Sequence, residues 1–237
     1  MTSIATHLQQ VRARIETACA QVGRPPHSVS LLAVSKTMPV ASVLDAIAAG
    51  QQAFGENYVQ EGVEKIRAVR AWEAEVVGAA PSQWHCIGPL QSNKTRVVAT
   101  HFDWVHSIDR LKIAERLAEQ RPPEMAPLQV CLQVNIDGGA NKSGVAPAEV
   151  LALARAVAAL PRLQLRGLMT IPEPVSGEEA QRAVHARAKL LFDAVRAAGV
   201  AGASFDTLSM GMTADLEAAV AAGSTMVRVG TAIFGAR

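Results

Sequence analysis

A single lysine at the end of an apolar run is the first residue whose position suggests chemistry. Lys36 closes the segment S-L-L-A-V-S-K-T, residues 30–37, and a proline and a helical pattern follow it. A strand buried on both faces reads as an apolar run, and parallel barrels place their functional groups where such strands end. The simpler interpretation is a surface lysine whose stem lies along apolar surface. The rest of the chain must decide between the two.

Two glycine-containing stretches near the C-terminus could bind an anion. They are S-M-G-M-T, residues 209–213, and R-V-G-T-A-I-F-G, residues 228–235. In barrels, phosphate sites are frequently built from the loops after strands seven and eight, where backbone N–H groups are free. Ser209 and Thr231 would add hydroxyl donors, and Gly211 and Gly230 would let the backbone approach the anion. The alternative is that these glycines only make tight turns, since neither stretch is a Walker or Rossmann fingerprint.

Hydrophobic periodicity predicts the elements that would position these residues. A helix over about residues 2–22 is followed by eight alternating strand and helix patterns, with strands near residues 30–35, 53–57, 84–87, 104–108, 128–136, 163–171, 205–210 and 226–230. Strict alternation predicts a parallel sheet, and eight repeats predict a closed TIM-type (β/α)8 barrel with an extra N-terminal helix. An open doubly wound sheet is the second choice. We expect one domain over residues 1–237, with longer connections only at 70–83 and 172–177.

Composition narrows the function classes. The 237 residues carry a formal charge of +2 and no block of Lys and Arg, which gives no support for nucleic-acid binding. Cys19, Cys86 and Cys131 lie far apart, which suits buried apolar residues in a reducing compartment. The N-terminus lacks a basic segment followed by an apolar core, and no apolar run reaches membrane-spanning length. A cytoplasmic protein without membrane contact is therefore expected.

The lysine and the anion-binding stretches would share one rim of such a barrel. A ligand with an aldehyde for the amine and a phosphate for the backbone N–H groups is pyridoxal 5′-phosphate, PLP. Arg228 alternates with the apolar Val227 and Val229, so its side chain could point into the barrel and reach the pyridine nitrogen. An arginine there disfavours protonation of the ring and weakens PLP as an electron sink. The alternative is an arginine paired with a neighbouring carboxylate.

Motifs in one order along almost the whole chain point to a known family. They are A-V-S-K-T, F-G-E-N-Y-V-Q-E, W-H-C-I-G-P-L-Q-S-N-K, V-N-I-D with N-K-S-G, G-L-M-T-I, L-S-M-G-M-T-A-D-L-E-A-A-V and V-R-V-G-T-A-I-F-G-A-R. With these motifs the sequence resembles the YggS/PROSC family of PLP homeostasis proteins, whose fold is similar to the barrel domain of alanine racemases. The resemblance implies a Schiff base on Lys36, with Arg228 near the pyridine nitrogen. It also implies phosphate contacts from Ser209, Met210, Gly211, Gly230 and Thr231, and places Asn57, His85 and Met169 around the ring.

The chain departs from some relatives in its lysines. Met38 stands where some members have a second lysine, and the chain ends at Arg237 where some continue with lysines. Such lysines are considered secondary acceptors of the cofactor, so a hand-off here must use another amine. Lys142, in N-K-S-G, is the remaining candidate, although a solvated loop lysine is the simpler interpretation.

Racemase chemistry is the main alternative to a carrier. Racemisation needs an acid or base on each face of the cofactor, and alanine racemases take the second from a tyrosine of another domain. Tyr58 is the one tyrosine here and follows the second strand. We therefore expect a monomeric protein that holds PLP without robust turnover and delivers it to PLP-dependent apo-enzymes. A third interpretation is a barrel that only sequesters phosphate-bearing ligands.

Overall fold

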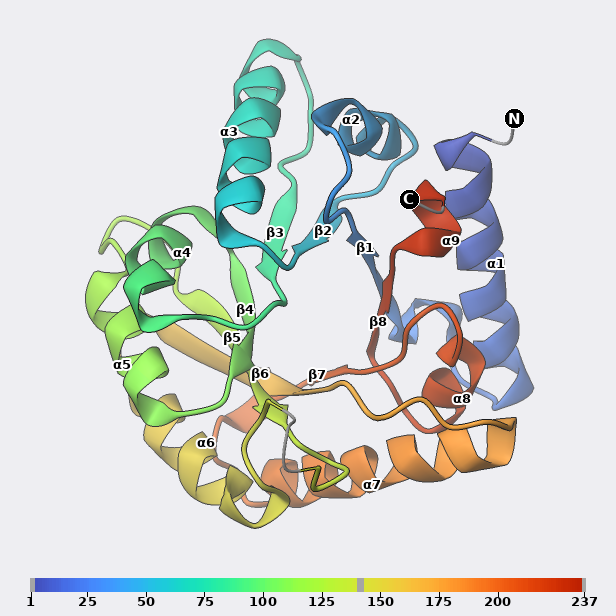
Figure 1. Ribbon diagram of the computed structural model, residues 1–237, viewed down its shortest axis with the longest axis vertical. Coiled ribbons are helices and arrows are strands. Elements are labelled where there is room, and N and C mark those ends of the chain that lie inside the picture. The colour runs from blue at the N-terminus through green and yellow to red at the C-terminus, as the bar shows by residue number, and fades with distance from the viewer. Residues whose placement is uncertain (1–2, 140–142, 236–237) are drawn as a thin grey trace.

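The structure, a computed structural model, describes residues 3–139 and 143–235, and eight parallel strands within them close into a barrel (Figure 1). Neighbouring strands in the sequence are neighbours in the sheet, and pairing of the last strand with the first closes it. The strands are β1 (Ser30–Val34), β2 (Ala53–Glu56), β3 (Gln83–Cys86), β4 (Trp104–Ile108), β5 (Leu128–Val134), β6 (Leu163–Thr170), β7 (Thr207–Ser209) and β8 (Met226–Val229). The predicted barrel is confirmed, and the open sheet is wrong.

Helices surround the barrel and connect its strands (Figure 1). They are α1 (Ile4–Gln21), α2 (Val40–Ala48), α3 (Val59–Glu75), α4 (Thr95–His101), α5 (Leu111–Gln120), α6 (Val150–Ala158), α7 (Glu178–Ala197), α8 (Leu216–Ala221) and α9 (Thr231–Phe234). The predicted N-terminal helix is α1, which lies beside α8 and α9. One detail differs from expectation: α3 continues to Glu75, which shortens the long connection expected at 70–83. The short α9 follows β8 and completes the eighth strand–helix unit.

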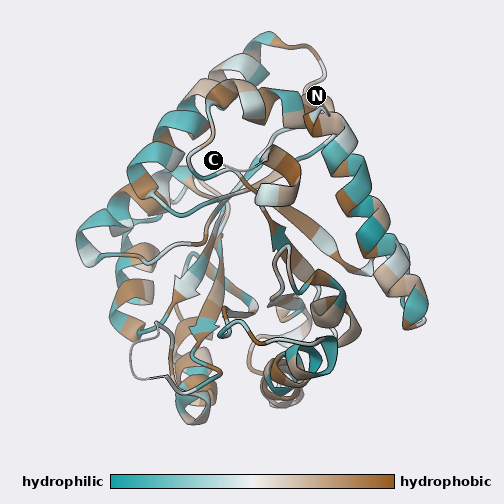
Figure 2. Ribbon diagram, turned by 45° about the vertical axis from the view of Figure 1, so that its right-hand side comes forward, coloured by the Kyte–Doolittle hydropathy of each residue, from teal (hydrophilic) through white to brown (hydrophobic). Residues whose placement is uncertain are grey.

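The side chains of each strand alternate between the surrounding helices and the barrel interior. On β8, Val227 and Val229 belong to the main hydrophobic core, while Met226 and Arg228 point to the inside. Figure 2 shows hydrophobic and hydrophilic residues mixed along the strands, and hydrophilic residues over much of the outer surfaces of the helices. Burial of the outward-facing residues therefore holds the barrel closed and leaves its interior for other roles.

The barrel interior combines two small apolar clusters with buried polar side chains. The clusters are Leu32 with Ile87 and Met226, and Trp104 with Cys131 and Met169; the polar side chains are His85, His106, Ser209 and Arg228. All three cysteines are buried and free, as expected from their spacing. Among the described residues, no helix is both long and apolar enough to cross a membrane.

Candidate functional site

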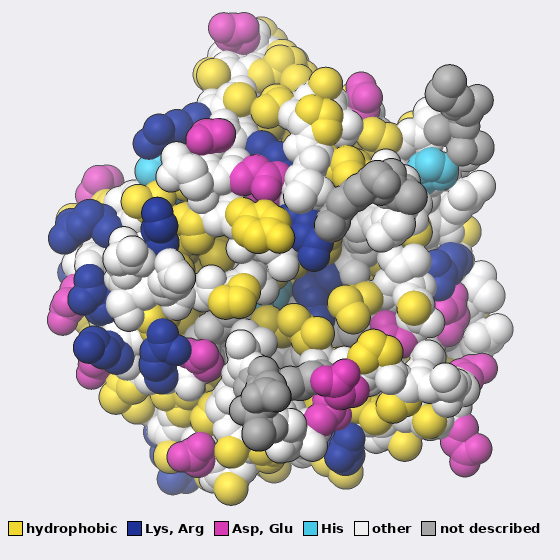
Figure 3. All heavy atoms as spheres, viewed as in Figure 1, with side chains coloured by type: hydrophobic (Ala, Val, Ile, Leu, Met, Phe, Trp, Pro, Cys, Tyr) yellow, Lys and Arg dark blue, Asp and Glu magenta, His cyan; other side chains and the backbone are white. Residues whose placement is uncertain are grey.

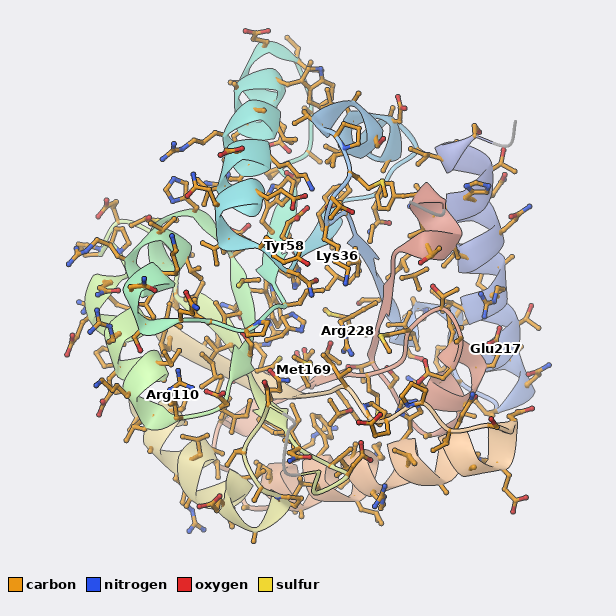
Figure 4. All side chains as sticks on the ribbon, viewed as in Figure 1. Lys36, Tyr58, Arg110, Met169, Glu217 and Arg228 are labelled. Atoms are coloured by element: carbon orange, nitrogen blue, oxygen red, sulfur yellow. The ribbon has the colours of Figure 1, made fainter. Side chains whose placement is uncertain are left out.

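Lys36 lies just beyond the carboxyl end of β1 and lines a cavity of about 400 Å³. Figure 4 shows Lys36 and Arg228 at this central opening, and Figure 3 shows Lys and Arg side chains gathered in the hollow on this face. The cavity is lined by Val34, Lys36, Met38, Asn57, Ile87, Ile171, Met212, Thr213, Ala214, Arg228, Gly230, Thr231, Phe234 and Gly235. An amine, a guanidinium and the start of α9 therefore face one space of small-molecule size.

Arg228 is the buried cation of this cavity. Its side chain is 4% exposed, and its Nη1 donates to both the carbonyl oxygen and the hydroxyl of Ser209, each at 2.8 Å. Nη2 donates to the carbonyl oxygen of Thr170, also at 2.8 Å. Burial lowers the pKa of Arg228 to about 10, which leaves it protonated at neutral pH. Three bonds hold the guanidinium rigidly, and a guanidinium has five N–H groups, so others remain for a ligand.

A hydrogen-bonded row of side chains continues from Arg228 into the barrel. Nδ1 of His106 lies 3.1 Å from the Ser209 hydroxyl, and its Nε2 lies 2.9 Å from Nδ1 of His85. Both histidines are fully buried in the interior, and burial lowers the pKa of His85 to about 3 and that of His106 well below its ordinary value. The two rings are therefore neutral at physiological pH and serve as fixed hydrogen-bonding groups beneath Arg228.

His85 does not reach the cavity around Lys36, contrary to expectation. Its ring stacks on Trp104, with centroids 5.1 Å apart, and it lines a different cavity of about 500 Å³ at the opposite end of the barrel. That cavity is bounded by the first residues of several strands, and none of the described residues lining it is a lysine. We place the functional site in the smaller cavity, because it combines the lysine with the carboxyl ends of the strands.

Four other expected residues lie close to the cavity without lining it. Met169 is fully buried with Trp104 and Cys131, and Ser209 is fully buried beneath Arg228, whose guanidinium it binds. Met210 points away from the interior into the main core. Gly211 has φ 92°, and a Cβ there would lie 2.4 Å from the Cβ of Ala219. Packing against α8 explains this glycine without any anion.

Asn57, Gly230 and Thr231 do line the cavity, as expected. Oδ1 of Asn57 is buried and has no hydrogen-bond partner among the described residues, which suits a polar ligand at this place. Met212, Thr213 and Ala214 also line the cavity. The first two belong to the stretch 209–213 that was expected to bind an anion, although neither was named as a contact, and Ala214 directly follows that stretch. Lys142 lies outside the described residues.

Comparisons with known proteins agree on one family. A family model described as alanine racemase, N-terminal domain, matches residues 6–237. A curated protein of Pseudomonas aeruginosa named pyridoxal phosphate homeostasis protein is 55% identical, covering 100% of this chain and 97% of the relative. The protein of the same name from Escherichia coli strain K12 is 54% identical, with 100% and 98% covered.

Solved structures show the same likeness. PipY of Synechococcus elongatus, determined with PLP bound, has a TM-score of 0.81 and 37% identity, covering 98% of this chain and 100% of PipY. Alanine racemase of Clostridium difficile has a TM-score of 0.73 at 13% identity, and the match covers 99% of this chain and 57% of the racemase. The racemase therefore shares the barrel fold, while the high-identity relatives carry the homeostasis name.

Proposed function

Since this chain belongs to the family of pyridoxal phosphate homeostasis proteins, which have the fold of the alanine racemase N-terminal domain, we propose that it binds PLP and serves PLP homeostasis. The observation that carries the proposal is the cavity that holds Lys36, Arg228 and Thr231 together at the carboxyl ends of the strands. The names of the relatives and the PLP-bound structure of PipY support it.

The residues of the cavity fit the chemical groups of PLP. This cofactor supplies an aldehyde that condenses reversibly with a primary amine. Lys36 is the amine, Gly230 and Thr231 are the proposed phosphate contacts, and Arg228 is held where it can face the ring nitrogen. Asn57 lines the cavity, and its buried Oδ1 has no hydrogen-bond partner among the described residues, so it is the proposed contact of a polar ring substituent. His85, Met169, Ser209, Met210 and Gly211 are proposed to act only indirectly, by supporting these groups.

Racemisation is not the proposed activity. Tyr58 is 57% exposed and lines a neighbouring depression with Val59, Gln60 and Lys94, rather than the cavity of Lys36. A cationic arginine near the ring nitrogen disfavours the proton that makes PLP a strong electron sink, which argues against broad carbanion chemistry. These features support a carrier that binds PLP without robust turnover.

The proposal extends to the cellular setting. We expect residues 1–237 to act as one PLP-binding domain and as a monomer in the cytoplasm. The recipients of the cofactor would be PLP-dependent apo-enzymes, with no nucleic acid and no membrane involved.

Replacing Lys36 tests the proposal directly. The purified protein loaded with PLP is expected to show a visible absorption band, which Lys36→Ala abolishes because no amine remains in the cavity. Borohydride reduction should attach the cofactor permanently to the peptide that contains Lys36. Lys112→Ala removes an exposed lysine of α5 and should leave the band unchanged. A full band in Lys36→Ala would contradict the proposal.

Two further assays separate the alternatives. A racemase would convert single-enantiomer alanine or serine to the opposite hand in the presence of PLP, and the carrier would not. A barrel that only sequesters phosphates would bind pyridoxine 5′-phosphate, which lacks the aldehyde, as tightly as PLP. We expect weaker binding of the alcohol, because it cannot bond covalently to Lys36.

A further inference from the structure

Three side chains outside the cavity bind the residues on both sides of Lys36, two of them through the backbone and one through the Ser35 hydroxyl. Nζ of Lys65 donates to the carbonyl oxygen of Ser35 at 2.6 Å, and the Ser35 hydroxyl donates to Oε1 of Glu56, also at 2.6 Å. On the other side of Lys36, Oε1 of Glu61 accepts the backbone N–H of Thr37. We call Glu56, Glu61 and Lys65 the carboxylate–lysine cluster. Its bonds fix the residue before Lys36 and the residue after it.

The cluster is one connected and largely buried unit. Nζ of Lys65 lies 2.9 Å from Oε1 of Glu56 and 2.6 Å from Oε1 of Glu61. The Lys65 side chain is 5% exposed and that of Glu56 is fully buried, whereas the Glu61 side chain is 29% exposed. Burial raises the pKa of Glu56, against the opposing bonds from Ser35 and Lys65. Buried ion pairs add little net stability, so a geometric role explains this arrangement better.

The turn held by the cluster has an unfavourable backbone conformation. Thr37 has φ 64°, in the left-handed region that a β-branched residue avoids. Such a residue persists only when its surroundings enforce it, and these outliers gather at functional sites. Two bonds within the turn support it, from the Met38 N–H to the Ser35 carbonyl oxygen and from the Thr37 hydroxyl to the Lys36 carbonyl oxygen. The bond from the Thr37 N–H to Glu61 is the support that comes from another element, α3. Because Lys36 is part of this turn, the turn also determines where its side chain points, and Figure 4 shows Lys36 at the central opening.

We propose that Glu61, supported by Lys65 and Glu56, is a positioning residue for Lys36. It holds the Lys36–Thr37 turn in the conformation that directs the amine into the cavity, and it thereby sets how long the protein retains PLP. This inference rests on the proposed function. Without the Glu61 contact the turn samples other conformations, and the amine is no longer prearranged for the cofactor.

Glu61 is the best residue to change, because its partial exposure lets the fold tolerate a substitution. Glu61→Met removes, at similar length, the acceptor of both the Thr37 N–H and Lys65 Nζ, and Glu61→Gln keeps an oxygen for both. Glu64→Met is the matched control on the same helix, since Glu64 is exposed and accepts only from Gln60 among the bonds described. We expect Glu61→Met to release PLP faster by about tenfold to a hundredfold, the effect of losing the charge-assisted hydrogen bond that holds the Thr37 N–H. Glu61→Gln should recover most of the loss.

A measurement without the cofactor reports on the turn itself. In PLP-free protein, hydrogen exchange at the Thr37 amide should become faster in Glu61→Met and stay slow in Glu61→Gln and Glu64→Met. In Thr37→Gly the positive φ is no longer unfavourable, so the turn depends less on Glu61. Adding Glu61→Met to Thr37→Gly should therefore speed PLP release by a smaller factor than Glu61→Met does alone. The melting temperature of each variant is measured as well, to detect a general loss of stability.

These experiments distinguish failure of the Glu61 proposal from failure of the proposed PLP binding. Absence of a Lys36-dependent band in the wild type would refute PLP binding, whatever Glu61 does. If that band is present, unchanged Thr37 exchange and unchanged PLP release in Glu61→Met overturn the positioning role. A lowered melting temperature with neither change would likewise overturn it. Faster exchange together with faster release, both rescued by Gln, supports it.

Discussion

Acidification below pH 6.5 is expected to destabilise the protein steeply, because two buried histidines resist protonation. Burial lowers the pKa of His85 from 6.5 to about 3. Between pH 6.5 and pH 3 this imidazole is therefore protonated in the unfolded chain but neutral in the folded protein. The stability contributed by the neutral ring is complete above pH 6.5 and is lost as the pH falls. The loss is about 1.4 kcal/mol for each pH unit from His85, and His106 adds to it with the same sign.

Denaturant unfolding at a series of pH values measures this effect. The free energy of unfolding should fall less steeply between pH 6.5 and pH 5 in His85→Gln and in His106→Gln than in the wild type. The slope of the unfolding free energy against pH is compared between variants. In this comparison the pH-independent cost of each substitution cancels, and so does the contribution of the carboxylates, which all the variants share. His27→Asn removes an exposed histidine and should retain the wild-type slope. Equal slopes in all four proteins would show that the buried rings do not control acid stability.

Gly167→Ala is expected to prevent or severely weaken folding. Gly167 of β6 pairs with Thr207 of β7, and a Cβ at this position would lie 1.7 Å from the Thr207 carbonyl oxygen. Neither backbone can move away without breaking the pairing that keeps the barrel closed. We expect a loss above about 4 kcal/mol in the free energy of unfolding, a range that few causes reach, severe overpacking of buried backbone among them.

Thermal unfolding followed by circular dichroism checks this expectation. Gly167→Ala should lower the melting temperature by more than about 10 °C, or leave no cooperative transition. Gly199→Ala is the control, because Gly199 has φ 67° but open space around its Cβ position. It should lose only about 1 kcal/mol from backbone strain. Similar melting temperatures for the two variants would mean that β6 and β7 separate easily.

The barrel fold, and the position of Lys36 at the carboxyl ends of its strands, could be predicted from the sequence. Both depend on local patterns of hydrophobic residues. Apolar runs alternating with helical stripes determine the topology, and parallel strands bring their carboxyl ends to one rim. For that reason Lys36, Arg228 and Thr231 were expected together, and they do line one cavity. Arg228 was expected inside from its alternation with Val227 and Val229, which the structure bears out.

The depth of a side chain inside the barrel could not be predicted. The alternating pattern puts His85 and Ser209 inside, but it does not say at which level along the axis they lie. The sheet register places His85 beside Trp104, the first residue of β4, and so far from the mouth. Glu61 and Lys65 were also missed, because their spacing on α3 is that of an ordinary surface ion pair. Only tertiary contact with residues 35 and 37 distinguishes them.

Because the guanidinium of Arg228 is buried, the melting temperature of the protein should report whether PLP is bound. The hydrogen bonds of this guanidinium within the described residues end on neutral oxygens, so an anionic ligand at the mouth relieves an electrostatic cost of folding. A ligand at a hundredfold excess over its dissociation constant adds about 2.7 kcal/mol by mass action. A candidate apo-enzyme that withdraws PLP would therefore reveal itself as a downward shift in the loaded protein's transition, with no need to measure the recipient's own catalysis.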